Sequence, residues 1–357
     1  MLSKPFVNLF NWNPQLFREI KGRLKVRNVA IAISASLLCQ FIVMMVFREM
    51  LPPTFVQYCV EVRPYCTDIN WSHWWADIFI TLSSILLTLM LIGGVYMLVA
   101  DLAKEKRLGT LNFIRLSPQS SQKILLGKLL GVPILIYLAG AIFLPLHLWA
   151  NISSGLPLSW FFGFYGILIK VCCFVYNISI LFVFLGGTQA WLAAAITGIF
   201  LLPIMGIVKL YTDEVRPLIG TDEMKVILIV GVIIILGFVL GNYWIWQAVN
   251  RRYRNPNSTI ISKKKSYWLM GCFQVYLLLF FLINISEKST VILKESLLFF
   301  CTINLLWFLL VISMLSPQRQ TVQDWAIYRH KQINNDETAI VKGLAISLKQ
   351  DLIWGEK

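Results

Sequence analysis

Charged residues are scarce along this chain of 357 residues, and histidine is scarcer still. Only 14% of the residues are charged, and the three histidines, His73, His147 and His330, lie far apart in the sequence. Enzymes embedded in membranes usually gather His, Asp or Glu at one depth for acid–base or metal chemistry. No such grouping is recognisable, so the sequence argues against an enzyme and offers no catalytic or metal-binding candidates.

A phosphate-binding loop of the form G-x-x-x-x-G-K-[ST] is also missing. The pair Gly127-Lys128 has no glycine at the required upstream position, and Leu129 follows it where the motif needs Ser or Thr. We therefore expect the chain to bind no cofactor directly. If ATP drives its function, a separate partner polypeptide must bind the ATP.

Cysteine is sparse, and most of it lies in apolar runs, where it packs as a small apolar residue. The exceptions are Cys59 and Cys66, which lie close together in one polar segment. Their spacing permits a disulfide in an oxidising compartment, but two cysteines alone leave free thiols as the alternative. No CxxC motif or His-Cys cluster accompanies them, so the pair is not a zinc site.

Long uncharged apolar runs are what the chain has in abundance, and hydrophobic residues make up 57% of it. About 20 helical residues cross the hydrocarbon core of a bilayer, and backbone groups within lipid must pair inside their own segment. The runs do not alternate as the strands of a membrane barrel do. We predict an all-α, polytopic helical membrane protein with about eight transmembrane helices. The eight runs are roughly 29–47, 78–100, 129–149, 158–185, 190–208, 226–246, 267–286 and 296–315.

The basic residues behind the net charge of +14 are concentrated in alternate segments. Residues 1–28, 101–128, 250–266 and 317–357 carry six Lys/Arg each, and the intervening loops carry few. This is the positive-inside pattern, which places the basic segments and both termini in the cytoplasm. We expect an integral protein of the plasma (inner) membrane of a bacterium. Its basic residues face anionic lipids of the bilayer, and we expect no nucleic-acid partner.

The same pattern suggests four regions. Residues 1–28 are predicted to form a cytoplasmic interfacial helix, because Asn13 can cap it and Pro14 suits its first position; a plain basic anchor is the alternative. The others are a six-span core at 29–249, a basic loop with two extra spans at 250–316, and a cytoplasmic tail at 317–357.

The segment 104–128, between the second and third spans, combines high charge with signals for local structure. It carries six Lys/Arg against one acid, Glu105. Gly109-Thr110 can begin a short helix, and Ser117-Pro118 can end it and begin another. A loop that only fixed topology would keep the charge without these helices. We therefore predict a helix–turn–helix that presents itself to a partner.

This segment resembles the first cytoplasmic loop of type-2 ABC transporter permeases. In that family an acid, a basic residue, Gly-Thr-Leu, a later proline and a Gly-Lys pair follow the second span. The matching residues are Glu105, Arg107, Gly109, Thr110, Leu111, Pro118, Gly127 and Lys128. Pro14 and Arg18-Glu19 resemble the connecting helix of the family. The resemblance covers roughly 13–249. The chain departs from the pattern at Asn112, where an acid is common, and in its two extra spans.

The resemblance implies the transmembrane permease subunit of an ATP-driven exporter. The helix within 104–128 would then be a coupling helix docked on an ATP-binding-cassette ATPase subunit, and Glu105, Arg107, Gly109, Thr110, Leu111 and Pro118 would be its coupling residues. A second permease subunit, identical or different, would complete the transporter. The chain itself would not be an enzyme, and the substrate stays open.

Two other functions stay open at this stage. An ion-coupled transporter would want intramembrane carboxylates beside broken helices, and the Gly and Pro residues of the third and fifth runs are the features that point that way. A non-transporting membrane scaffold is the second. Lys170, deep in the fourth run, has two explanations as well: a charge in the path of an anionic substrate, or a lysine that reaches the interface.

Overall fold

The computed structural model describes residues 12–51, 58–60, 62–63, 65–66, 68–201, 222–256, 258–285 and 290–316, and these are almost entirely helical. The chain divides into two compact units, Met1–Val239 and Leu240–Lys357, which we call unit 1 and unit 2. The division falls close to the boundary predicted at 250, which stays a prediction. The predicted tail, 317–357, lies outside the described residues.

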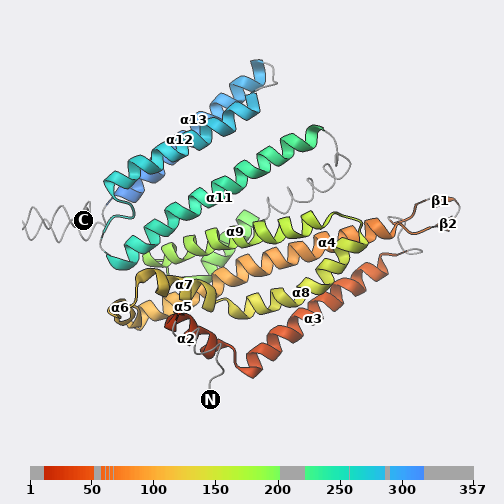
Figure 1. Ribbon diagram of the computed structural model, residues 1–357, viewed down its shortest axis with the longest axis horizontal. Helices are drawn as coiled ribbons and strands as arrows, with labels where there is room; N and C mark the ends of the chain where they lie inside the picture. The colour runs from red at the N-terminus through yellow and green to blue at the C-terminus, as the bar shows by residue number, and fades with distance from the viewer. Residues whose placement is uncertain are drawn as a thin grey trace, which may run out of the picture. The chain divides into compact units, whose positions relative to one another are not determined.

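Five helices in the described part are long and apolar enough to cross a membrane (Figure 1). The all-helical prediction is therefore confirmed, but the predicted count of eight is not. Two shorter apolar helices, Ala190–Leu201 and Phe300–Leu315, fall in the fifth and eighth predicted runs. The five are α3 (Val26–Glu49), the continuous helix formed by α4 (Trp71–Thr88), η1 (Leu89–Gly93) and α5 (Gly94–Arg107), α8 (Ile134–Ser153), α9 (Leu158–Phe184), and Gly231–Arg254 within α11 (Asp222–Arg254). Unit 2 continues with α12 (Lys263–Ile285) and α13 (Thr290–Leu315).

In unit 1, α8 packs against both α3 and α4, and α5 packs against α9. Ile78, Leu82 and Leu86 recur every four residues along α4 and are buried almost completely, as expected for a face turned to a neighbouring helix. His147 of α8 adds a polar contact in this core. The Tyr165 hydroxyl lies 3.0 Å from its Nδ1, and Ser83 Oγ lies 2.8 Å from its Nε2.

These three side chains satisfy one another's hydrogen-bonding groups. Ser83 Oγ donates to the Phe79 carbonyl at 2.8 Å, so it must accept from His147 Nε2, while Nδ1 accepts from Tyr165. The ring of His147 also stacks on Phe79, with centroids 4.3 Å apart. The contact joins α4, α8 and α9. Because the hydrogen-bonding groups of the three side chains satisfy one another, we assign the contact a role in helix packing.

The long helix from Trp71 to Arg107 contains one π-helical turn, η1. A π-helical turn leaves carbonyls in need of donors. The Tyr176 hydroxyl of α9 donates to the Met90 carbonyl at 2.6 Å. Tyr176 can approach so closely only because residue 94 is glycine: a Cβ there would lie 1.9 Å from the tyrosine oxygen.

A small disulfide-bonded hairpin precedes α4. Strands β1 (Val62–Arg63) and β2 (Tyr65–Cys66) pair antiparallel. The sulfurs of Cys59 and Cys66 are bonded at 2.07 Å. The buried Tyr58 donates its hydroxyl to Asp77 at 2.9 Å, and burial together with this carboxylate raises the pKa of Tyr58. The hairpin is therefore fastened to the first turns of α4.

Candidate functional site

The segment between the second and third spans has the predicted helix, break and helix. Gly109 takes φ = 73°, a left-handed conformation, at the N-terminus of the short helix α6 (Thr110–Arg115). Glycine adopts this conformation without the steric cost that a Cβ brings. After the break, Ser120 caps α7 (Ser121–Gly131) by accepting a hydrogen bond from the Lys123 amide.

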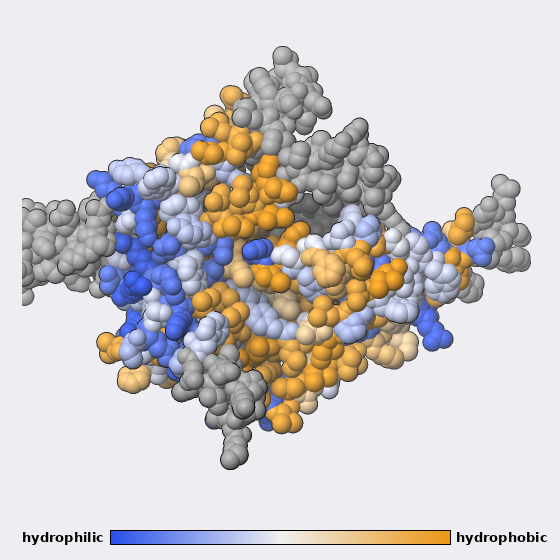
Figure 2. Space-filling model, in the orientation of Figure 1, coloured by the Kyte–Doolittle hydropathy of each residue, from blue (hydrophilic) through white to orange (hydrophobic). Residues whose placement is uncertain are grey.

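The two faces of this segment differ sharply. Leu111 and Ile114 of α6 are buried. On the opposite face Leu108, Phe113 and Leu116 are 66%, 78% and 85% exposed, and we call these three residues the apolar tip. Hydrophilic side chains predominate at the end of unit 1 where α5, α6 and α7 meet (Figure 2). Apolar residues exposed together in such surroundings are typical of a protein-binding surface.

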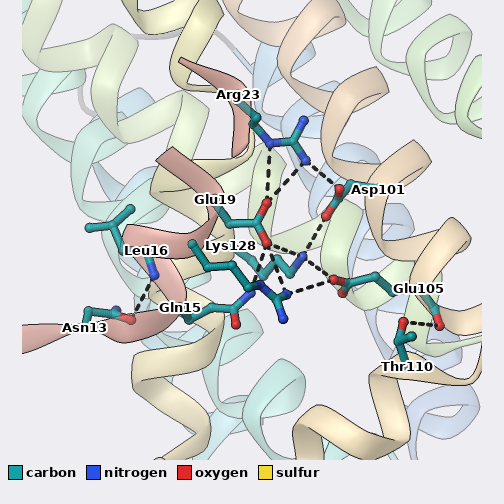
Figure 3. Close-up of polar contacts among 10 residues, drawn as sticks. Asn13, Gln15, Leu16, Glu19, Arg23, Asp101, Glu105, Thr110 and Lys128 are labelled. Carbon is teal, nitrogen blue, oxygen red and sulfur yellow. Dashed lines mark hydrogen bonds and ion pairs between the residues drawn. The ribbon is translucent and has the colours of Figure 1, made fainter. Parts of the chain in front are cut away.

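Behind the apolar tip lies a cluster of charged side chains around Lys128 of α7 (Figure 3). Its side chain is only 3% exposed. The ammonium Nζ lies 2.6 Å from Glu19 Oε1, 2.7 Å from Asp101 Oδ2 and 2.6 Å from Glu105 Oε1. Glu19 belongs to α2 (Pro14–Arg23), and the two other acids belong to α5. One lysine therefore joins three helices.

Two arginines of α2 complete what we call the ion cluster. Arg23 pairs with Asp101 and, at 3.4 Å, with Glu19. Arg18 pairs with Glu105 at 3.2 Å, but its side chain is half exposed, so this pair contributes little. With Lys128 there are three cations for three carboxylates, and the formal charge of the ion cluster is zero. A balanced group is what allows charges to be buried at tolerable cost.

Lys128 supplies the positive charge that the three carboxylates of the ion cluster require, so they need no metal ion. The ligand oxygens of Glu19, Asp101 and Glu105 lie within 4.8 Å of one another, as the ligands of a cation would. Lys128 Nζ touches all three and supplies the positive charge. Burial lowers the pKa of Lys128, but the three carboxylates more than offset this effect and hold the pKa above its ordinary value. In the described part of the chain no other group of three or more His, Cys, Asp or Glu converges in this way.

Helix α2 packs against α7 with almost no space between them. A Cβ on Gly127 would lie 2.9 Å from the Leu16 amide nitrogen, and one on Gly131 would lie 2.5 Å from the Cβ of Glu19. The predicted cap is confirmed, since the Leu16 amide donates to Asn13 Oδ1 at 3.1 Å. These two glycines, one turn apart, let the backbone of α2 approach until Glu19 reaches Lys128.

On its other side the segment contacts the end of α9. Lys106 Nζ donates to the Val183 carbonyl at 2.9 Å, which satisfies a carbonyl at the helix C-terminus. The Arg115 guanidinium of α6 lies 5.9 Å from the centre of the Phe184 ring, within the range of a cation–π contact. The end of α5 and the end of α6 are thus both fixed to α9, which leads into the apolar core.

The structure distributes the residues suggested by the sequence over different roles. Glu105 belongs to the ion cluster, and the Thr110 hydroxyl donates to the Glu105 carbonyl at 3.2 Å. Arg107 and Pro118 are exposed beside the apolar tip, and Leu111 is buried beneath it. Lys170 belongs to a different place, halfway along α9. Sequence reasoning did not assign Asp101, Arg23 or the buried state of Lys128. Asp101 and Glu105, four residues apart at the end of an apolar run, were the available signal.

No family model, curated protein or solved structure matches the chain.

Proposed function

We propose that the chain is the transmembrane permease subunit of an ATP-driven exporter, and that a separate ATPase subunit docks on the apolar tip. The observation that supports this most directly is the exposure of Leu108, Phe113 and Leu116, on the short helix α6 and at its two ends. Exposed apolar residues on a loop cost solubility without a partner to cover them. The resemblance of 104–128 to the coupling loop of type-2 permeases points to the same kind of partner.

The contacts behind α6 provide a route from the partner to the membrane helices. A push on α6 acts directly on α5 and α7 through the chain. It acts on α2, and so on α3, through the ion cluster, and on α9 through Lys106 and Arg115. A group of helices joined by buried ion pairs and close packing moves as one body. ATP-driven movement of the partner is in this way transmitted to the spans.

The chemistry of the apolar tip defines what the partner must offer. It needs an apolar groove for Phe113 and Leu116, with acidic residues opposite Arg107. ATP is bound and hydrolysed on that partner. We propose that a second permease subunit, identical or different, completes the transporter in the plasma membrane of a bacterium, with both termini of this chain in the cytoplasm.

Co-purification tests the proposal. The chain is solubilised from its native membrane, and the proteins that accompany it are identified by mass spectrometry, with Phe113→Asp and Val60→Asp as matched variants. Both residues are exposed, but Val60 lies in the disulfide-bonded hairpin. We expect an ATP-binding-cassette ATPase to accompany the unmodified chain and Val60→Asp, and to be lost with Phe113→Asp.

A backbone variant adds an independent arm. Gly109→Val meets no neighbouring atom but forces a β-branched residue into a left-handed conformation, at a cost of about 1–3 kcal/mol. Gly109→Asn tolerates that conformation and serves as the control. We expect substrate-stimulated ATPase activity to fall with valine and to survive with asparagine. If no ATPase accompanies any form of the chain, an ion-coupled transporter or a membrane scaffold takes the place of this proposal.

A further inference from the structure

An apolar cavity of about 350 Å³ opens between α8 and α9, beside η1. We call it the lateral groove. Its size lies within the range of small-molecule sites. It extends from Leu129 and Leu130, at the end of the third span expected in the cytoplasm, to Leu144 of α8 and Tyr165 of α9, nearer the opposite end of these helices. Six of the residues that line it are Met90, Leu130, Tyr137, Ala141, Ile169 and Cys173.

Lys170 is not itself a lining residue of the lateral groove but is a neighbour of two of them on α9. It follows Ile169 directly, and Cys173 is one helical turn further on, so Lys170 borders the lining residues of α9. Gly163 and Gly166, on the turns before it, have no atom within 4 Å of where a Cβ would be, and the space beside the lysine is open. Its side chain is exposed, and within the described part of the chain it makes no hydrogen bond or ion pair.

The depth of Lys170 makes an unpaired ammonium costly. Lys170 is the thirteenth of the 27 residues of α9, so it lies near the middle of a candidate span. A charge at that depth is expensive, and such residues normally have a partner or line a pathway. None of the eight apolar runs contains Asp or Glu. Neither this chain nor a second copy of it can therefore supply a carboxylate at the same depth.

We propose that the lateral groove and Lys170 together bind an anionic amphiphile, whose apolar chain lies in the lateral groove and whose anionic group pairs with the ammonium. A resident phospholipid keeps its headgroup at the interface, about 15 Å from the middle of the bilayer. An anionic headgroup at the depth of Lys170 is therefore that of a molecule in transit. This inference rests on the proposed export function and names its substrate class.

Two native cysteines of the lateral groove, Cys172 and Cys173, provide a direct test of binding. The purified full-length chain in phospholipid nanodiscs is treated with methyl methanethiosulfonate, and the modification rate of each cysteine is followed by peptide mass spectrometry. Three probes share one chain length: hexadecyl phosphate, hexadecanol and hexadecyltrimethylammonium. We expect hexadecyl phosphate to slow the modification of Cys173 at the lowest concentration and the cationic probe to have the least effect. Cys39 and Cys301, outside the lateral groove, should be unaffected.

Variants separate the charge from the apolar surface. Lys170→Met should raise the concentration of hexadecyl phosphate needed for half-protection by about tenfold or more, since an ion pair away from water is worth at least that factor. It should leave hexadecanol unchanged, and Lys170→Arg should retain the preference for the phosphate. Ala141→Phe fills the lateral groove and should abolish protection by all three probes. Ala35→Phe, at an exposed alanine of α3, is the matched control.

Equal protection by the phosphate and the alcohol, or a phosphate preference that survives Lys170→Met, would overturn the inference. So would the absence of any protection of Cys173. The assay contains no ATPase, so its outcome is independent of the docking experiment. Selective binding without an ATPase partner would reject the exporter and leave the site. An ATPase partner without selective binding would keep the exporter and reject this substrate class.

Discussion

Lys128 shows how a single residue can decide whether charge is tolerable inside a protein. Three carboxylates converge on its ammonium within 2.7 Å, and two arginines neutralise what remains. Removing one member of a buried, balanced group typically costs about 3–5 kcal/mol, because the partners stay buried without compensation. The lysine therefore matters more through the charges it would leave behind than through its own contacts.

We predict that Lys128→Met strongly destabilises unit 1, whereas Lys123→Met, at an exposed position of the same helix, has little effect. Adding Glu105→Gln to Lys128→Met should recover part of the loss, because it removes one of the uncompensated charges. Thermal unfolding of the purified variants in detergent measures this. Equal melting temperatures for the two single variants would contradict the prediction.

The pKa of Lys128 predicts how the difference in stability between the unmodified chain and Lys128→Met depends on pH. Its folded-state pKa is raised above the ordinary value of 10.5. The stability it contributes is thus fully present below that value and is lost only as the pH rises through the folded pKa. Between neutral pH and the ordinary value, the difference between the unmodified chain and Lys128→Met should therefore stay constant.

At the level of helices, the contact between α2 and α7 depends on the lack of a side chain at Gly127 and Gly131. We predict that Gly127→Val separates the two helices, because the backbone of Leu16 in the way of the new Cβ is not free to move aside. Gly22→Val, in α2 with no atom within 4 Å of the new Cβ, meets no such obstacle and is the control.

A disulfide trap measures the separation. Asn13→Cys, at the start of α2, is combined with Lys123→Cys on α7, because the Asn13 side chain reaches the Lys123 carbonyl at 2.7 Å. Cross-linking is then compared in the two glycine backgrounds. We expect cross-linking to decrease with Gly127→Val and to persist with Gly22→Val. Unchanged cross-linking with Gly127→Val would show that α2 does not depend on this close approach.

Local elements were more accessible to sequence analysis than the site they build. The break after α6, its start at Gly109 and the cap at Asn13 follow from residue types within a few positions of one another, so they could be predicted. The ion cluster could not, because it unites residues 19, 101 and 128 through tertiary packing, and the spacing of Asp101 and Glu105 does not show which side chains they meet. The lateral groove is equally invisible, since its lining residues look like any lipid-facing apolar sequence.

At the scale of the whole chain, the helix from Trp71 to Arg107 sets the distance between the disulfide-bonded hairpin and the apolar tip of unit 1 (Figure 1). Its 37 residues extend about 55 Å at 1.5 Å per residue, more than the thickness of a bilayer with its headgroups. The hairpin and the apolar tip are therefore expected on opposite sides of the membrane.

We predict that a membrane-impermeant maleimide labels Pro157→Cys in intact cells but labels Leu116→Cys only after permeabilisation. Pro157 directly precedes α9 at the end expected outside, and Leu116 belongs to the apolar tip. Asn255→Cys, in the basic loop of unit 2, should behave like Leu116→Cys. Labelling of Leu116→Cys or Asn255→Cys from outside intact cells would reverse the predicted orientation.

The π-helical turn at Leu89–Gly93 has a consequence for the distant carboxylates. An α-helix advances about 100° per residue, so a surplus residue in one turn sets the rotational phase of everything that follows it. Asp101 lies eight residues, about 12 Å, beyond Gly93. Without the surplus residue, the side chains of Asp101 and Glu105 would point in a different direction from α5. Neither carboxylate would then contact Lys128. The π-helical turn therefore sets the direction in which the carboxylates of Asp101 and Glu105 point.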